Sequence, residues 1–181
     1  MIRELPTAEE LKKIDLSDIY NHCTAEKYWI DYTSSEYYYK LLAWFSTKFD
    51  NVPLVEVGTY QGIGAYCMAY NKKNHVHTFD VGDYNKINGV DNITFRIDNI
   101  INDKYKFLLQ QSPFIFLDTN HDGIFEAEFY EYLQKINYKG LLLLDDTKLN
   151  DEMKNFVDSI NHETIDITHI GHGSGTHLVY F

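Results

Sequence analysis

The chain has few of the features that mark secreted, metal-stapled or membrane proteins. Its 181 residues include only two cysteines, Cys23 and Cys67, and no C-x-x-C pair. This usage indicates neither a zinc site nor a disulfide framework. No segment approaches the ~20 consecutive apolar residues of a membrane span. The opening segment, MIRELPTAEELKK, lacks the apolar core of a signal peptide. We therefore predict a soluble, cytoplasmic protein with no membrane partner.

Basic residues are also scarce. The chain carries 16 Lys and Arg against 27 Asp and Glu, a formal net charge of −11, and no cluster of basic residues. A protein that tracks phosphate backbones needs a basic face. The sequence therefore predicts no nucleic-acid partner, whereas a cationic small ligand is compatible with this charge.

The length predicts a single domain over residues 1–181. We expect residues 1–50 to form a short helical cap on a core of residues 51–181. The capping-box spacing of Thr7 and Glu10 predicts one helix in this cap. The same spacing at Thr33 and Glu36 predicts a second helix, ending near residue 49.

Beyond residue 52 short apolar runs alternate with amphipathic stretches. The predicted strands are 53–58, 76–82, 92–98, 114–118, 140–146, 165–171 and 176–181. The predicted helices are 62–71, 101–111, 123–136 and 151–160. This alternation is typical of an α/β fold with a mostly parallel sheet. Only residues 172–175 separate the last two predicted strands, which is too short for a crossover, so we expect an antiparallel hairpin there.

A glycine-rich turn follows the first predicted strand. The segment VEVGTYQGIGAY places Gly58, Gly62 and Gly64 there. Glycine permits a tight turn and a close approach of a ligand to the backbone. Asp80 ends the next predicted strand, where a carboxylate can accept hydrogen bonds from ribose hydroxyls. The pattern predicts a nucleoside cofactor, and the alternative is a purely structural turn followed by an unrelated aspartate.

Two features argue against a nicotinamide cofactor. The glycine spacing is G-x-x-x-G-x-G, which differs from the G-x-G-x-x-G of dinucleotide-binding folds. In addition, Glu56 lies inside the strand motif, where an acidic group would attract the cationic head of S-adenosylmethionine.

These segments resemble a known family. VEVGTYQGIGAY looks like motif I of the class I S-adenosylmethionine-dependent methyltransferases, in the form found in catechol-type and macrocin-type O-methyltransferases. FIFLDTNHDGIF and KGLLLLDDT resemble the fourth and fifth strand motifs, and HIGHGSGTHLVYF resembles the last two strands. The resemblance covers about residues 50–181. It implies a Rossmann-like three-layer α/β/α sandwich, with a seven-stranded sheet whose last strand is antiparallel.

The resemblance also implies an enzyme that uses S-adenosylmethionine to methylate a hydroxyl of a small-molecule acceptor, with sugars as one class. Related enzymes often dimerise, so a homodimer is one assembly it allows. The implied cofactor-binding residues are Glu56, Gly58, Tyr60, Gly62, Gly64, Asp80, Asp98 and Asn99.

Three carboxylates follow two predicted strands. Asp118 ends the fourth strand, and Asp145 and Asp146 end the fifth. Neighbouring strands lie about 4.8 Å apart, so these groups can converge at the carboxyl edge of the sheet. Converging carboxylates repel one another unless a cation lies between them, and all-oxygen ligation suits Mg²⁺, with Mn²⁺ and Ca²⁺ as alternatives. The resemblance implies the same metal site, and the competing interpretation is that these residues cap loops and helices.

His121 lies three residues after Asp118, where catechol-type enzymes carry a catalytic lysine. An imidazole there can accept the proton of the acceptor hydroxyl. Asp118 is the alternative base. We interpret His169, His172 and His177 as a surface group near the terminal hairpin, too far from Asp118 to share its metal.

The aromatic run of the cap favours packing against the sheet, with an acceptor-binding wall as the alternative. The run comprises Tyr28, Trp29, Tyr32, Tyr37, Tyr38, Tyr39 and Trp44. Two other functions remain open at this point. One is a non-catalytic module that binds S-adenosylmethionine or a nucleoside. The other is a metal-independent methyltransferase or a hydroxylase-like enzyme on the same fold.

Overall fold

The computed structural model describes residues 2–25 and 37–181. The predicted capping residues Thr33 and Glu36 lie outside them, as do Tyr28, Trp29 and Tyr32. The predicted box at Thr7 and Glu10 is present and begins the first helix. Within the described ranges, no helix combines the length and apolar character needed to cross a membrane.

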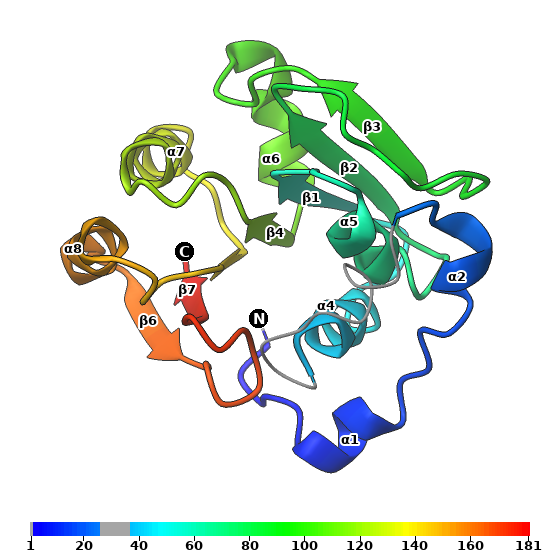
Figure 1. The fold of residues 1–181 in the computed structure, drawn as a ribbon. Helices are drawn as coiled ribbons and strands as arrows, with labels where there is room; N and C mark the ends of the chain where they lie inside the picture. The colour runs from blue at the N-terminus through cyan, green and yellow to red at the C-terminus, as the bar shows by residue number, and fades with distance from the viewer. Residues whose placement is uncertain (1, 26–36) are drawn as a thin grey trace.

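Seven strands form one sheet in the order β3-β2-β1-β4-β5-β7-β6 (Figure 1). Their bounds are β1 Pro53–Val57, β2 His75–Asp80, β3 Ile93–Ile97, β4 Phe114–Leu117, β5 Leu141–Leu144, β6 Glu163–Asp166 and β7 His177–Tyr180. Strands β1 to β5 pair in parallel, whereas β7 is antiparallel to both β5 and β6. The predicted α/β fold, with its antiparallel last strand, is confirmed.

The sixth strand differs from its prediction. It ends at Asp166 rather than at residue 171, so the connection to β7 is longer than the expected four residues. The backbone N–H and hydroxyl of Thr168 both donate to Asp166 Oδ1, at 3.0 and 2.6 Å, which turns the chain away from the sheet. Ile167 and Ile170 are buried beneath this turn. Because these two isoleucines are buried, the apolar pattern of the turn resembles that of a strand. The predicted antiparallel pairing of β6 with β7 is nevertheless correct.

Helices cover both faces of the sheet (Figure 1). The helices are α1 Ala8–Lys12, α2 Ile19–His22, α4 Tyr38–Ser46, α5 Ile63–Met68, α6 Lys106–Gln111, α7 Ile124–Lys135 and α8 Asp151–Ser159, and a 3₁₀ turn, η1 Asp103–Tyr105, precedes α6. Helices α1, α4 and α5 contribute to the core on one face, and α6, α7 and α8 to the core on the other. Alternate strand residues enter the two cores, as Leu54 and Val55 do in β1, because successive side chains of a strand point to opposite faces.

Helix α4 runs along the strands, from the carboxyl ends of β4 and β5 toward the amino end of β2. At its far end, the side-chain amides of Asn71 and Asn74 donate to the carbonyls of Ser46 and Phe49, at 2.8 to 2.9 Å. These bonds satisfy carbonyls that have no partner inside the helix. They fix α4 along the sheet, so that its first residue, Tyr38, reaches the ends of β4 and β5.

Candidate active site

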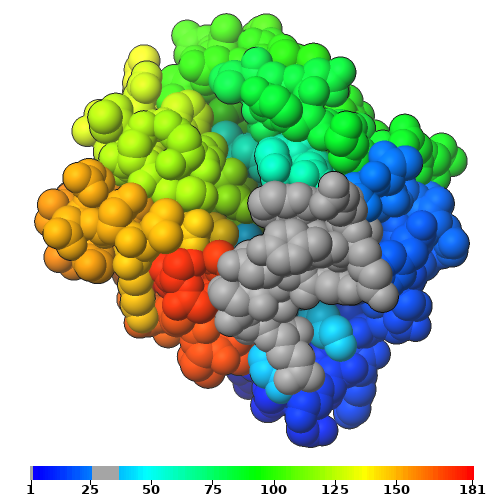
Figure 2. All heavy atoms as spheres, viewed as in Figure 1, coloured from blue at the N-terminus to red at the C-terminus, as the bar shows by residue number. Residues whose placement is uncertain are grey.

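A cavity of about 650 Å³ opens at the carboxyl ends of β1, β2 and β4. It is lined by Val57, Gly58, Tyr60, Phe79, Asp80, Val81, Tyr84, Asp98, Asn99, Ile100, Asp118, Thr119, Asn120, His121 and Phe125. Figure 2 shows the hollow between the yellow-green atoms around the start of α7 and the green atoms that follow β2. Ligands of open α/β sheets bind at this edge, where the strand order reverses.

The turn after β1 brings the ends of β1 and β4 together. Gly58 has φ +98°, and a Cβ on it would lie 1.6 Å from the carbonyl oxygen of Asp118. Only glycine fits such an approach of two backbones. Gly62 has φ +83° and is the N-cap residue of α5. Gly58 lines the cavity, whereas Gly62 is not among its lining residues.

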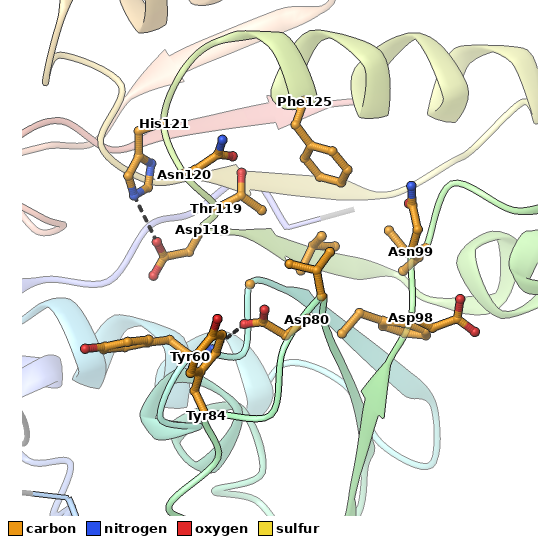
Figure 3. Close-up of a pocket in the computed structure, with 15 residues that line it drawn as sticks. Tyr60, Asp80, Tyr84, Asp98, Asn99, Asp118, Thr119, Asn120, His121 and Phe125 are labelled. Carbon is orange, nitrogen blue, oxygen red and sulfur yellow. Dashed lines mark hydrogen bonds and ion pairs between the residues drawn. The ribbon is translucent and has the colours of Figure 1, made fainter.

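Asp80 holds the turn from the neighbouring strand. Its Oδ2 accepts the backbone N–H of Tyr60 at 2.8 Å, and its Oδ1 accepts that of Gly82 at 3.2 Å. Figure 3 shows the carboxylate beside Tyr60 and Tyr84, whose ring centroids are 6.2 Å apart. The arrangement presents an acceptor group and two aromatic rings to the cavity.

Glu56 is not among the described residues that line the cavity. It is buried beneath α5, where it accepts the hydroxyl of Thr78 and the backbone N–H of Ala65. Burial raises the pKa of Glu56 well above its ordinary value. A Cβ on Gly64 would lie 2.2 Å from Glu56 Oε1, so the missing side chain at this position makes room for Glu56.

Asp98 and Asn99 line the cavity, but their polar groups have local partners. The Oδ2 of Asp98 accepts Lys104 Nζ and the hydroxyl of Tyr105, which lower the pKa of Asp98. Figure 3 shows this carboxylate directed away from Asp80 and Asp118. The Oδ1 of Asn99 accepts the backbone N–H of Ile101 at 2.8 Å. The Oδ2 of Asp98 and the Oδ1 of Asn99 therefore already have partners within the protein.

The three predicted carboxylates gather around two shared neighbours. The hydroxyl oxygen of Tyr38 lies 2.8 Å from Asp145 Oδ2 and 3.3 Å from Asp118 Oδ2. His121 Nε2 lies 3.4 Å from Asp118 Oδ1 and 3.2 Å from Asp146 Oδ2. The three acids thus form one group at the ends of β4 and β5, which adjoins the cavity through Asp118 and His121. Among the described residues, Asp145, Asp146 and His172 offer ligand atoms within 4.8 Å of one another, and Asp118 is not part of that set.

The acids differ in their electrostatic state. Burial, then repulsion from Asp118 and Asp146, raises the pKa of Asp145 well above its usual range. For Asp146 burial acts in the same direction, but hydrogen bonds from His172 and Ser174 outweigh it and lower the pKa. Burial opposes the charged form of His121, but Asp118 and Asp146 still raise its pKa. The group therefore holds both a carboxyl that resists ionisation and one that favours it.

Three residues without glycine's freedom adopt left-handed backbone here. They are Tyr60 at φ +42°, His121 at +56° and Asp146 at +52°. Such conformations are costly outside glycine and asparagine, and they cluster at functional sites because the surrounding structure imposes them. Each of the three begins or interrupts a loop at the carboxyl edge of the sheet.

No protein-family model and no curated protein matches this sequence. Solved structures do match. A putative caffeoyl-CoA O-methyltransferase from Staphylococcus aureus aligns at 14% identity over 97% of this chain and 93% of that one, with a TM-score of 0.60. The O-methyltransferase from Bacillus cereus in complex with SAH gives 12% identity, 97% and 92% coverage, and 0.54. The O-methyltransferase TomG from Streptomyces achromogenes gives 13% identity, 78% coverage of each chain, and 0.54.

The chain has the class I methyltransferase fold. Within this fold the cavity occupies the carboxyl edge of β1 and β2, and the acidic group lies beside it at β4 and β5. The predicted residues Gly58, Tyr60, Asp80, Asp98 and Asn99 line the cavity.

Two residues of this methyltransferase-fold site were not predicted as site residues. Tyr38 is expected from the sequence to pack against the sheet, with an acceptor-binding wall as the alternative, and in the structure its hydroxyl reaches two of the acids. His172 was assigned to a surface group, yet its Nδ1 lies 2.8 Å from Asp146 Oδ1. The other two histidines of that group differ: His169 is exposed, and His177 Nδ1 lies 2.7 Å from the hydroxyl of Thr147. No local pattern distinguishes His172 from its neighbours in the sequence.

The acidic group suits a cation. Among the described residues no hydrogen-bond donor reaches Asp145 Oδ1, although this oxygen is buried. A buried carboxylate oxygen without a partner is costly, and a metal ion is one group that satisfies it. The carboxylate oxygens of Asp118, Asp145 and Asp146 are also the ligand type that hard divalent cations prefer.

Proposed function

We propose that this chain is an S-adenosylmethionine-dependent O-methyltransferase that acts on a small hydroxylated acceptor with the help of a divalent cation. One observation carries the proposal: a single cavity joins the glycine and aspartate elements after β1 and β2 to the Asp118–His121 end of the acidic group. A methyl donor and an acceptor hydroxyl have to meet in such a place.

The methyl donor occupies the β1–β2 side in this proposal. Asp80 accepts the ribose hydroxyls, Gly58 lets the donor approach the backbone, and the apolar walls of Phe79, Ile100 and Phe125 enclose the adenine. The Bacillus cereus structure was determined with SAH and the TomG structure with SAM, which supports S-adenosylmethionine as the methyl donor.

The chemical step is an in-line displacement. The acceptor oxygen forms a bond to the methyl carbon while the carbon–sulfur bond breaks, and the electron pair of that bond stays on sulfur to give neutral S-adenosylhomocysteine. The hydroxyl proton passes to the Asp118–His121 pair, whose Oδ1 and Nε2 atoms lie 3.4 Å apart. Alignment of oxygen, carbon and sulfur by the cavity supplies much of the acceleration.

The cation would be held by Asp118, Asp145 and Asp146. A divalent ion there lowers the pKa of a bound hydroxyl and orients it. Tyr38 orients the carboxylates of Asp118 and Asp145 through its hydroxyl. An acceptor with adjacent hydroxyls, sugars included, fits a site that binds oxygen in this way.

The test measures S-adenosylhomocysteine formed from S-adenosylmethionine with a panel of catechols and sugars, with and without chelator. We expect turnover that chelator abolishes and added divalent metal restores. Asp145→Asn should reduce kcat by at least about 100-fold, the scale for loss of a group that stabilises transition-state charge. Asp151→Asn is the matched control, because Asp151 is exposed on α8. Binding of S-adenosylmethionine without turnover on any acceptor would instead indicate a non-catalytic module.

A metal-independent methyltransferase is the second candidate, favoured by the position of His121 in the cavity beside two carboxylates. The same assay separates the two. If chelator leaves turnover intact while His121→Asn abolishes it, the cation has no part in the reaction.

A further inference from the structure

His172 contributes a nitrogen atom to the acidic group. One ligand atom from each of Asp145, Asp146 and His172 lies within 4.8 Å of the others. The Nδ1 of His172 is 2.8 Å from Asp146 Oδ1 and 3.7 Å from Asp145 Oδ1. The three atoms therefore surround one small volume on the β7 side of the acids.

An independent observation points to a ligand in that volume. Asp145 is 3% exposed, and its Oδ1 has no hydrogen-bond donor among the described residues. Its Oδ2 is engaged by Tyr38 at 2.8 Å, which leaves Oδ1 facing His172. Buried carboxylate oxygens are normally satisfied, so this one marks a place for a positive group.

The loop before β7 holds His172 in place. Its backbone N–H donates to Thr176 Oγ1 at 2.7 Å, and its ring lies against Tyr38 with centroids 4.9 Å apart. The loop is joined to the end of β5, because the N–H groups of Thr147 and Lys148 donate to the carbonyls of Gly175 and Ser174, at 3.1 and 2.7 Å. The imidazole is therefore positioned before any ion binds, which lowers the entropic cost of binding.

We infer that His172 Nδ1 is a protein ligand of the cation, and that the mixed nitrogen and oxygen site prefers a first-row transition metal of the Mn²⁺ to Zn²⁺ series over Mg²⁺. Imidazole suits borderline metals such as Co²⁺, Ni²⁺ and Zn²⁺, whereas Mg²⁺ keeps to oxygen ligands. This inference rests on the cation part of the proposed function. It changes the identity of the ion and adds a ligand that lies far from the acids in the sequence.

The experiment measures binding of Co²⁺ and Mg²⁺ to the metal-free protein by calorimetry, with the melting temperature as a second readout. We expect one Co²⁺ site at least about tenfold tighter than the Mg²⁺ site. His172→Ala should weaken Co²⁺ binding by about 10- to 100-fold, the range for lost metal-site contacts, and change Mg²⁺ binding by less than about threefold. His169→Ala is the control: this histidine is exposed on the same loop, and its removal should leave both affinities unchanged.

A second variant keeps the test valid if His172→Ala fails to fold. His172→Gln keeps a polar group able to hydrogen-bond Asp146 but offers oxygen in place of an aromatic nitrogen. It should remove the preference for Co²⁺ and keep Mg²⁺ binding.

The outcomes separate the two claims. If both His172 variants bind Co²⁺ as the wild type does while Asp145→Asn does not, the site uses oxygen alone and the inference is wrong, but the proposed cation stands. If the wild type binds no divalent ion, the inference and the cation part of the proposed function both fail. Methyl transfer in the presence of chelator is measured separately.

Discussion

Asp80 combines two tasks at the scale of a single residue: it holds the turn after β1 through Tyr60 and faces the cavity. Its replacement by alanine should weaken S-adenosylhomocysteine binding by about 1.5–3 kcal/mol, as for lost hydrogen bonds to a charged group. Calorimetry on the folded variant measures this. Asp83→Ala, an exposed aspartate in the same loop, should bind as the wild type does. Unchanged affinity in Asp80→Ala would place the cofactor elsewhere.

Gly58 leads to a stability prediction at the same scale. Gly58→Ala would drive its Cβ into the Asp118 carbonyl, 1.6 Å away, so the backbones of two strands must separate. We expect a loss of about 3 kcal/mol or more in the free energy of unfolding, measured in urea. Gly89→Ala is the matched control: its φ is also positive, at +68°, but its Cβ would meet only His22 Nδ1 at 3.6 Å. That substitution should cost about 1 kcal/mol, the price of left-handed backbone alone. Equal losses in the two variants would contradict the close approach.

At the scale of elements, strand β2 carries two neighbouring histidines, His75 and His77, and the adjacent strand β3 places Arg96 beside them. Burial, with the neighbouring His75 and Arg96, lowers the pKa of His77 to about 4. The ring centroids of His75 and His77 are 4.9 Å apart, and Arg96 reaches His77 Nδ1 at 3.5 Å. His77 therefore takes up a proton at a lower pH in the folded protein than in the unfolded chain, where its pKa is about 6.5.

This difference gives the pH dependence a sign. Above about pH 6.5, the ordinary histidine pKa, both states leave His77 neutral. As the pH falls from there toward 4, the unfolded state gains a proton that the folded state excludes, and stability decreases. His77→Gln should lose less unfolding free energy than the wild type between about pH 7 and pH 4.5, measured in urea at each pH. His169→Gln, at an exposed position, should follow the wild type. A His77→Gln curve that coincides with the wild-type curve would remove His77 as the cause.

For the whole molecule, the net charge of −11 sets the expected partners. Sequence-independent binding to nucleic acid requires cations that replace counterions along the phosphates, and this chain has no basic cluster. We expect fluorescence anisotropy of labelled RNA and DNA to stay constant with added protein at physiological salt. Binding in the micromolar range, weakening steeply with salt, would overturn this expectation.

The sequence by itself determined the order and type of most elements and the edge at which the site residues gather. Apolar runs of four or five residues between amphipathic stretches define buried parallel strands, and the residues that end such strands share one edge. Gly58, Asp80, Asp118 and Asp145 reach that edge for this reason alone. Their binding roles stay predictions, since geometry places them but measures no affinity.

Only the tertiary structure decided which side chains turn toward the site. Glu56 and Asp98 stand at the predicted positions, but the carboxylate of Glu56 accepts a hydrogen bond from Thr78 and that of Asp98 from Lys104. Conversely, Tyr38 and His172 join the acids only because α4 is fixed along the sheet and the β7 loop is joined to β5. A sequence pattern reports a residue's neighbours within a few positions. Convergence of side chains 26 residues apart, as in His172 and Asp146, or 107 apart, as in Tyr38 and Asp145, depends on how helices and loops pack across the sheet, which no local spacing records.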